Sequence, residues 1–152
     1  MATLHLMIGL PCSGKTIRAR ELADEHHALL LTPDVWHVQL FGQDIHDADH
    51  DRRHGAIEAI MWDVAARVLP LGVDVILDFG CWAREEREDF RSRAARAEAA
   101  FRLHFMDVPS DELYRRLDAR NGSLPPGVFA IPRSEMARYM AIFEPPGLDE
   151  LV

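Results

Sequence analysis

Gly9-Leu10-Pro11-Cys12-Ser13-Gly14-Lys15-Thr16 is the segment that decides the fold of this 152-residue chain. It fits G-x-x-x-x-G-K-[ST], the pattern of the phosphate-binding P-loop. Lys15 is the only lysine, so the other sixteen of the 17 Lys and Arg residues are arginines. A composition that favours arginine explains the missing lysines, but it does not explain why the remaining one lies here. The segment therefore predicts a loop that binds phosphate groups.

The residues on either side supply the context that a P-loop requires. Leu4–Ile8 is an apolar run typical of a buried strand, and a helix is expected from Thr16 onward. Glycines at 9 and 14 let the backbone turn and bring N–H groups toward one anion. Lys15 would reach the β- and γ-phosphates of ATP, and the Thr16 hydroxyl would bind Mg²⁺. The residues expected to hold the nucleotide are Gly9, Pro11, Cys12, Ser13, Gly14, Lys15 and Thr16.

Length and composition limit the class of protein. With 152 residues the chain is most simply one domain over residues 1–152. The formal net charge of −8 argues against a long basic groove for duplex nucleic acid. The two cysteines, Cys12 and Cys81, are more typical of a reduced intracellular protein than of a disulfide scaffold. No basic leader and no apolar stretch of membrane-spanning length is visible, so a cytoplasmic protein is expected.

Strand and helix patterns alternate along the chain, which predicts an α/β fold: a three-layer α/β/α sandwich with a mostly parallel sheet. On helix 56–69 the residues Ile57, Ile60, Met61, Val64 and Val68 are expected to face inward, as are Ile17, Leu22 and Ala23 on helix 16–26. Residues 42–53 are polar and read as a loop that leads into a helix. The expected strands are 4–8, 28–31, 73–78 and 101–108, and the expected helices are 16–26, 35–41, 56–69, 84–97, 110–121 and 134–143.

Two aspartates follow predicted strands, so both are expected at the edge of the sheet where ligands bind. Asp34 would accept the proton of an acceptor hydroxyl, although it could also simply cap the helix that follows. Asp78 ends an apolar strand as a Walker B carboxylate does, where it would hold Mg²⁺ or its water shell. The alternative for Asp78 is a solvated acid at a strand end.

Arg116 and Arg120 lie four residues apart on one helix face, where like charges repel unless an anion lies between them. Glu112 can pair with Arg116, which leaves an ordinary explanation for one of the two. The γ-phosphate of ATP would offset the positive charges of both side chains, so these arginines are candidates for stabilising the transition state. They precede a Gly/Pro-rich segment, 121–133, that we expect to be a flexible lid, and Arg133 is a weaker third candidate.

Three histidines recur every four residues, at His46, His50 and His54. On a helix this spacing could present a transition-metal face. Because residues 42–53 lack an apolar periodicity, a solvated segment is the expected structure, with contact to a substrate as a further alternative. Cys12 and Cys81 flank the predicted nucleotide site, where a redox role is conceivable.

With these features together, the chain resembles the small P-loop kinases of the predicted-kinase group, which are AAA-type ATP-binding proteins. That group is similar to the ATP-binding half of polynucleotide 5′-hydroxyl kinases, to zeta toxins and to chloramphenicol phosphotransferase. The likeness covers nearly the whole chain and is carried by residues 9–16, 32–34, 72–78, 82, 87 and 116–121. It implies a kinase. Polynucleotide kinases usually have an arginine three residues after the base aspartate, whereas this chain has His37 there.

The leading hypothesis is therefore an ATP- and Mg²⁺-dependent kinase that phosphorylates a hydroxyl group of a small molecule. Trp36, Phe41, Phe79 and Trp82 lie near strand ends and could line the acceptor pocket, or they could belong to the core. One alternative is a 5′-hydroxyl polynucleotide kinase, because nucleic-acid ends remain conceivable acceptors. Another is a nucleotide-gated binding module or slow ATPase switch. The sequence speaks against a GTPase switch, since it has neither a D-x-x-G nor an N-K-x-D motif.

Overall fold

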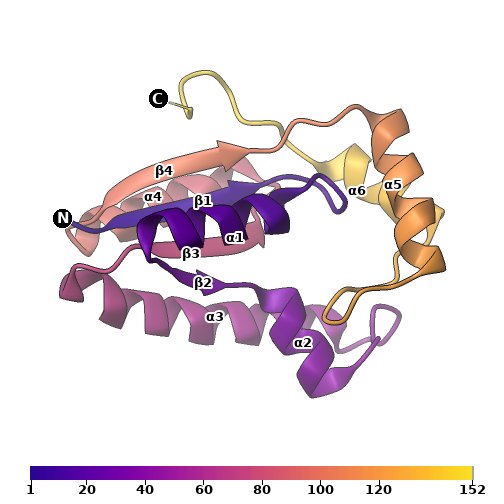
Figure 1. Cartoon of the computed structure of the whole chain (residues 1–152), viewed down its shortest axis with the longest axis horizontal. Coiled ribbons are helices and arrows are strands. Elements are labelled where there is room, and N and C mark those ends of the chain that lie inside the picture. Colours follow the sequence, from indigo (N-terminus) through magenta and orange to yellow (C-terminus); the bar gives the residue numbers. More distant parts are fainter. Residues whose placement is uncertain (152) are drawn as a thin grey trace.

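The computed structural model describes residues 1–151 and is built on a four-stranded parallel sheet with the strand order β2-β3-β1-β4 (Figure 1). The strands are β1 (Thr3–Ile8), β2 (Leu29–Leu31), β3 (Val75–Gly80) and β4 (Ala100–Phe105). Register pairs Leu6 of β1 with Leu77 of β3 and with Leu103 of β4. All pairings among these strands are parallel, so their carboxyl ends meet at one edge.

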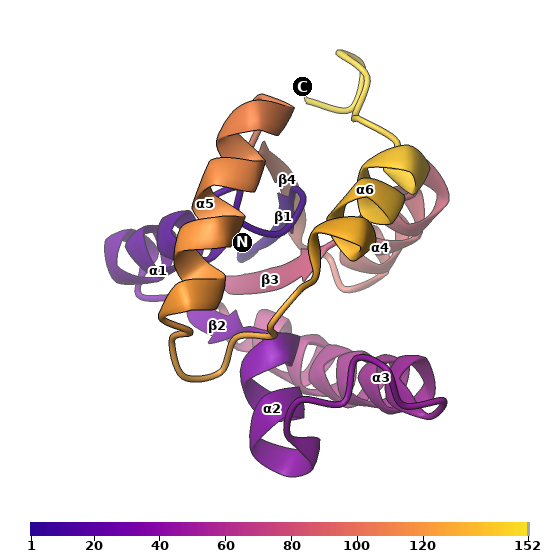
Figure 2. The same ribbon diagram turned by 90° about the vertical axis from the view of Figure 1, so that its right-hand side faces the viewer.

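Helices cover both faces of the sheet, which confirms the α/β sandwich expected from the alternating pattern. Figure 2 shows α1 on one side of the sheet, with α3 and α4 on the other. The helices are α1 (Lys15–His26), α2 (Pro33–Phe41), α3 (His50–Val68), α4 (Arg84–Arg96), α5 (Ser110–Gly122) and α6 (Arg133–Ile142), with a short 3₁₀ turn η1 (Leu69–Leu71) after α3.

Alternation along the two central strands divides the core into two clusters, because successive side chains of a strand point to opposite faces. Leu4 and Leu6 of β1 pack in the cluster with α3 and α4. Met7 of β1 and Ile76 of β3 pack instead with the buried side of α1. Central parallel strands are apolar on both faces for this reason. The sheet therefore holds the loops at its carboxyl edge on a rigid base.

Three side chains expected to face the core are exposed instead: Ile17, Ile60 and Val64. In α1 the packed side is marked by Ala19, which lies about 200° around the helix from Ile17. In α3 the buried residues recur every four positions at Ile57, Met61 and Ala65. Ile60 and Val64 each precede one of these by about 100°. The small Ala65 lets α3 approach the sheet along this narrower stripe.

The start of α3 was also wrong by several residues, since the helix begins at His50 and not near Ala56. Its first turn has no apolar anchor, and it is held by polar contacts described below. The N-cap position of α5 is Pro109, and no side chain of the described residues caps this helix.

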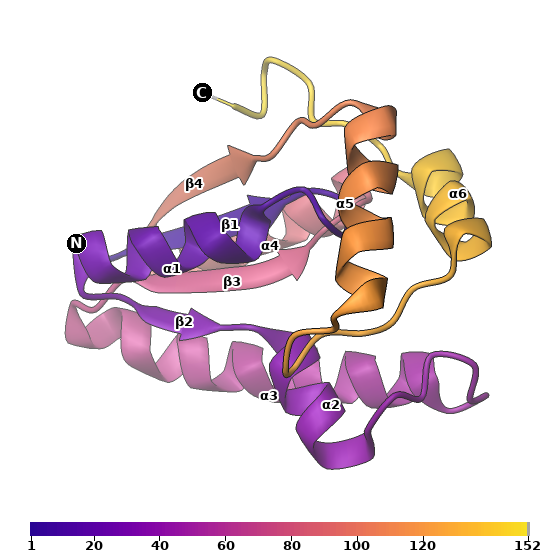
Figure 3. The ribbon, with the colours of Figure 1, turned by 45° about the vertical axis from the view of Figure 1, so that its right-hand side comes forward.

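The carboxyl ends of the strands point toward α2, α5 and α6, which gather at this end of the molecule (Figure 3). A third apolar cluster joins these elements through Leu117, Phe129, Ile131 and Met136. It includes the segment after α5, so part of the expected lid is packed against its neighbours. Within residues 1–151, no helix is at once long enough and apolar enough to cross a membrane.

Candidate functional site

The phosphate loop connects β1 to α1 and has the backbone that the sequence pattern requires. Gly14 has a φ of +87° at the N-cap of α1, a conformation that side chains disfavour. A Cβ at Gly9 would lie 2.5 Å from the Ser13 hydroxyl oxygen. The Gly9 N–H donates to the Gly80 carbonyl at 3.3 Å, and the Trp82 indole N–H donates to the Gly9 carbonyl at 3.2 Å. The end of β3 therefore holds the loop in place.

Lys15 and Thr16 both face Asp78 at the end of β3. The Lys15 ammonium lies 3.5 Å from one Asp78 carboxylate oxygen, and the Thr16 hydroxyl donates to the other at 2.8 Å. Burial disfavours the charged ammonium, but the charges of Asp78 and Asp34 outweigh it and raise the pKa of Lys15. Lys15 is therefore a cation at neutral pH, as binding to phosphates requires.

The residues expected to hold magnesium form a suitable set of oxygen donors. The Asp78 side chain is fully buried, and its Oδ1 accepts no hydrogen bond. The Thr32 hydroxyl donates to Asp78 Oδ2 at 3.3 Å, beside the bond from Thr16. Oδ1 faces the Lys15 ammonium at 3.5 Å without a hydrogen bond, and a hard cation would satisfy this buried oxygen more fully. Thr16 and Asp78 thus fit Mg²⁺.

Arg116 and Arg120 both reach the vicinity of the phosphate loop from α5. Arg116 donates to the Cys12 carbonyl at 3.1 Å while its Nε donates to Glu112 at 2.9 Å. Arg120 donates to the Phe129 carbonyl at 3.4 Å, and its buried Nε has no partner. Burial raises the pKa of the Cys12 thiol, although Arg120, Lys15 and Arg116 oppose that shift. The two arginines are thus close enough to the loop to face a bound phosphate.

Arg133, the weaker candidate, is engaged elsewhere. Its guanidinium donates to Asp118 at 2.7 Å and lies 4.4 Å from the centre of the Tyr114 ring. Both charged side chains are exposed. Nothing brings Arg133 to the phosphate loop.

A cavity of about 510 Å³ begins at Gly9 and Lys15 and extends between α3 and α6. Asp34 lies on its wall, in the first turn of α2. The N-cap of that helix is Thr32, so the interpretation of Asp34 as a helix cap is wrong. The other lining residues are Pro11, Ile45, Asp47, His50, Asp51, His54, Gly55, Glu58, Phe79, Gly80, Cys81, Trp82, Glu86, Phe129, Ile131, Arg138, Tyr139 and Ile142.

Aromatic side chains form one wall of this cavity. Phe79 and Trp82 line it, as expected, and the Trp82 ring lies 4.8 Å from that of Tyr139 on α6. Trp36 and Phe41 do not line it and are partly exposed on α2. Sequence reasoning missed Tyr139 because the tertiary fold alone brings α6 over the end of β3.

A cluster of histidines and acids supports the opposite wall. His37 is completely buried, and its Nε2 lies 2.7 Å from Asp44 Oδ1. His50 Nδ1 lies 2.7 Å from the same oxygen, and Arg53 donates to the other Asp44 oxygen at 3.0 Å. His54 completes the cluster, with its Nδ1 3.0 Å from His37 Nδ1. These contacts explain why α3 begins at His50 without an apolar anchor.

The expectation of a solvated segment around His46, His50 and His54 is only partly correct. His46 is exposed, whereas His50 and His54 line the cavity from one face of α3. The ligating atoms of His37, Asp44 and His50 could gather around a metal ion. Here, however, ring nitrogens and Arg53 already engage both Asp44 oxygens. The four-residue spacing signalled the histidine face, but no sequence pattern signalled His37 or Asp44.

Glu58 is a further cavity residue that sequence reasoning missed. It lies one turn after His54 on α3, with its Oε1 3.6 Å from His54 Nε2. Burial, together with the charges of Glu86 and Asp34, raises the pKa of Glu58 to about 7. The cavity therefore holds several carboxyl groups whose mutual repulsion is only partly relieved by cations.

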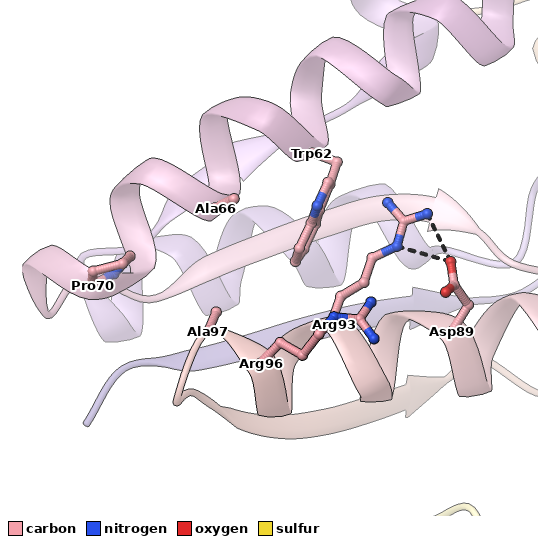
Figure 4. A pocket seen from close by; sticks show the side chains of 7 residues that line it. All are labelled: Trp62, Ala66, Pro70, Asp89, Arg93, Arg96 and Ala97. Carbon is pink, nitrogen blue, oxygen red and sulfur yellow. Dashed lines mark hydrogen bonds and ion pairs between the residues drawn. The ribbon is translucent and has the colours of Figure 1, made fainter.

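A second hollow of about 490 Å³ lies between α3 and α4, away from the phosphate loop (Figure 4). Its walls are formed mainly by Trp62, Asp89, Arg93 and Arg96. Arg93 donates to Asp89 at 2.8 Å and lies 5.3 Å from the Trp62 ring centre. Arg93, Asp89 and Trp62 thus contact one another, and none of the lining residues belongs to the phosphate loop.

Comparison with known proteins agrees with this geometry. A family model described as an AAA domain matches residues 4–146. No curated protein matches the chain. A solved structure of a candidate kinase from Chloroflexus aurantiacus j-10-fl is similar, with a TM-score of 0.76 and 18% identity over 97% of this chain and 82% of that one.

Two further solved structures have the same fold. Kti12 from Chaetomium thermophilum, in complex with ADP-AlF3, has a TM-score of 0.72 and 22% identity over 95% of this chain and 81% of that one. A sugar kinase from Janibacter sp. HTCC2649 has a TM-score of 0.70 and 18% identity over 99% of this chain and 83% of that one.

Proposed function

Since this chain belongs to the AAA-domain family of small P-loop kinase-like proteins, we propose that it is an ATP- and Mg²⁺-dependent kinase that phosphorylates a hydroxyl group of a small molecule. One observation carries the proposal: a single cavity joins the phosphate loop at Lys15 to the carboxylate of Asp34. A phosphoryl donor and an acceptor hydroxyl could therefore meet in one cavity. The similar Kti12 structure holds ADP-AlF3, which supports ATP as the nucleotide.

Each part of the site has a role in this proposal. The loop amides and Lys15 bind the phosphates, and Thr16 and Asp78 hold Mg²⁺. When bound, the ion would neutralise charge on the phosphate oxygens. Asp34 orients the acceptor hydroxyl and accepts its proton.

The arginines and the lid act on the transferred group in this proposal. Arg116 and Arg120 face the γ-phosphate from α5 and stabilise the charge of the transition state. Residues 121–133 form a lid that excludes water while the phosphoryl group moves. Gln43 supports this assignment. Its side-chain N–H donates a hydrogen bond to the Val128 carbonyl, and its side-chain oxygen accepts one from the Ala130 N–H, so it links the segment to the loop after α2.

The charges of the cavity support a small, non-phosphorylated acceptor over a nucleic-acid end. The cavity is lined by Asp34, Glu58 and Glu86, which would repel the phosphates of a nucleotide strand. His37, which stands where polynucleotide kinases usually have an arginine, is buried and cannot reach an acceptor. The structural likeness to a sugar kinase agrees with a small-molecule acceptor. A cytoplasmic location is also part of the proposal, and the free thiols of Cys12 and Cys81 support it.

The test offers the purified chain, Mg²⁺ and γ-labelled ATP to two sets of acceptors. One is a pool of sugars, polyols and hydroxylated antibiotics, and the other contains 5′-hydroxyl oligonucleotides. Mass spectrometry identifies the compound that gains a phosphoryl group, and Asp34→Asn serves as the control because it keeps the shape of the side chain. We expect one small molecule to be labelled, and the label to be lost in the variant.

Two other results would redirect the proposal. Labelled oligonucleotide ends would establish a polynucleotide kinase instead. ATP hydrolysis that no acceptor accelerates would favour a nucleotide-gated binding module or slow ATPase switch.

A further inference from the structure

A continuous chain of side chains runs from Asp34 at the cavity wall to Asp44 in the interior. His54 Nε2 lies 3.8 Å from Asp34 Oδ1, and His54 Nδ1 lies 3.0 Å from His37 Nδ1. His37 Nε2 then lies 2.7 Å from Asp44 Oδ1. Glu58 Oε1 also lies near His54 Nε2, at 3.6 Å. His54 is therefore the link between the proposed base and a buried hydrogen-bond network.

The buried end of this chain determines where His54 carries its proton. Burial opposes ionisation of Asp44, yet the hydrogen bonds from His37, His50 and Arg53 hold its pKa well below the usual range. An ionised carboxylate only accepts hydrogen bonds, so His37 must donate through Nε2. A neutral His37 then has a lone pair on Nδ1, and His54 must donate to it through its own Nδ1–H. The Nε2 of a neutral His54 is thereby left as a lone pair beside Asp34.

The surroundings keep His54 neutral and ready to take up a proton. Burial lowers the pKa of His54, and the nearby His37 and His50 lower it further, whereas Asp34 and Asp51 oppose the shift. Several titratable or charged groups face His54 or its carboxylate neighbours. From α2 these are Asp34 and His37, and from the loop after it Asp44. The others are His50, Asp51 and Glu58 from α3, Glu86 from α4, and Lys15, which lies beside Asp34. Near neutral pH, Glu58 is itself half protonated.

We propose that His54 is the positioning residue of the acceptor site, held by His37 and Asp44 so that its Nε2 receives the proton that Asp34 takes from the acceptor hydroxyl. This inference rests on the proposed kinase function. In the reaction the acceptor oxygen forms a bond to the γ-phosphorus, while the bond to the β,γ-bridging oxygen breaks and its electron pair leaves with ADP. The hydroxyl proton passes to the Asp34 carboxylate and then to His54.

The direction of this transfer follows from ordinary basicity. An imidazole is intrinsically a stronger base than a carboxylate, and the lowered pKa of His54 narrows that difference. Asp34 would return to its ionised form before the product leaves. The 3.8 Å gap is longer than a hydrogen bond, and catalytic contacts of this kind commonly tighten only when substrate binds.

The first test needs no acceptor. In the full chain labelled with ¹⁵N-histidine, NMR reports which ring nitrogen of His54 carries the proton, and His54→Gln assigns the signal. At pH 8 we expect the Nδ1–H form, with Nε2 unprotonated. Asp44→Asn should weaken this preference, because an amide can donate to His37 where a carboxylate cannot. An Nε2–H form in the unaltered chain would overturn the proposal, even if Asp44→Asn failed to fold.

The second test measures the rate against pH with water as the acceptor, in basal ATP hydrolysis, and with any compound labelled in the panel. His54→Gln should lower kcat about 10- to 100-fold with little change in KM for ATP. The rate of the unaltered chain should rise with pH below about pH 6.5, because the pKa of His54 is lowered and only the unprotonated ring can accept a proton. His54→Gln should flatten that rise. His46→Gln is the matched control, since His46 is exposed and outside the cavity.

The two tests separate failure of this inference from failure of the proposed function. Transfer that keeps its pH profile in His54→Gln, or that falls equally at every pH, would refute the role of His54 and leave the kinase intact. If NMR shows the expected Nδ1–H form but neither water nor any panel compound receives a phosphoryl group, the kinase proposal fails, while the hydrogen-bonded arrangement of His54 with His37 stands without a proton to relay.

Discussion

Removing the Glu150 carboxylate should destabilise the protein far more than its place near the end of the chain suggests. Its side chain is only 1% exposed and pairs with Arg87 of α4, which is equally buried. Two guanidinium nitrogens donate to it, at 2.7 and 3.2 Å. Arg87 also donates to the carbonyls of Cys81 and Trp82 at 3.1 and 3.2 Å. Glu150 therefore neutralises a cation that braces the chain beside the phosphate loop.

The magnitude follows from the state in which Glu150→Ala leaves Arg87. Breaking a buried ion pair by removing one partner costs about 3–5 kcal/mol, because the remaining charge is buried without compensation. We expect about 3 kcal/mol, near the lower limit, because the tail can lift away and admit water to the guanidinium. For a chain of this length that loss lowers Tm by roughly 6–12 °C.

Thermal and urea denaturation of the full chain measure this effect, and Asp149→Ala provides the matched control. Asp149 pairs with Arg84, but both side chains are about half exposed, so this ion pair is screened by water. The control should shift Tm much less. Equal shifts in the two variants would refute the argument from burial. So would a double variant, Arg87→Met with Glu150→Leu, that is no more stable than Glu150→Ala, because apolar residues should remove the uncompensated charge.

Three further predictions concern the loop, α3 and the buried acid. Gly9→Ala places a Cβ 2.5 Å from the buried Ser13 hydroxyl. Overpacking of about 1–3 kcal/mol should weaken ADP binding roughly 5- to 150-fold by calorimetry, and an unchanged affinity would contradict this prediction. At Gly55, in the interior of α3, an added Cβ would meet no atom within 4 Å. Gly55→Ala should therefore increase the free energy of unfolding by about 0.5–1 kcal/mol and raise the urea midpoint. A lower midpoint would count against the boundaries of this helix. The pKa of Asp44 is depressed in the folded state. Its contribution to the free energy of unfolding is therefore complete above the unfolded-state pKa, near 4, and is lost as the pH falls below that value. Denaturation in acid should show a shallower stability decline in Asp44→Asn, and parallel curves would refute this.

Much of the nucleotide site could be predicted because its residues lie next to recognisable strands. The glycines and Lys15 form one local pattern, and that pattern has a single structural solution between a strand and a helix. Asp78 could be added because parallel strands bring their carboxyl ends to one edge, where the Thr16 hydroxyl lies 2.8 Å from it. The arginines of α5 were proposed from their spacing and from their place before the Gly/Pro-rich segment.

The acceptor side of the site could not be predicted in the same way. Hydrophobic periodicity finds helices by their apolar faces, so it missed the first turn of α3, which His37 and Asp44 hold by polar contacts. It also placed Ile60 and Val64 in the core, since it counts apolar residues without knowing how closely a helix approaches the sheet. Glu58 looked like an ordinary surface acid, and only its neighbours in space raise its pKa.

The sequence by itself determined the fold class, the phosphate loop and the residues proposed to face a nucleotide, because local spacing and the direction of parallel strands are enough to place them. Only the tertiary structure decided the shape and charge of the acceptor cavity, the support of His54 by His37 and Asp44, and the closure of the tail by Glu150 on Arg87. Those contacts join residues as far as 63 positions apart, through hydrogen bonds that leave no periodic signal. Their geometry depends on how helices pack at the edge of the sheet, which a linear pattern does not encode.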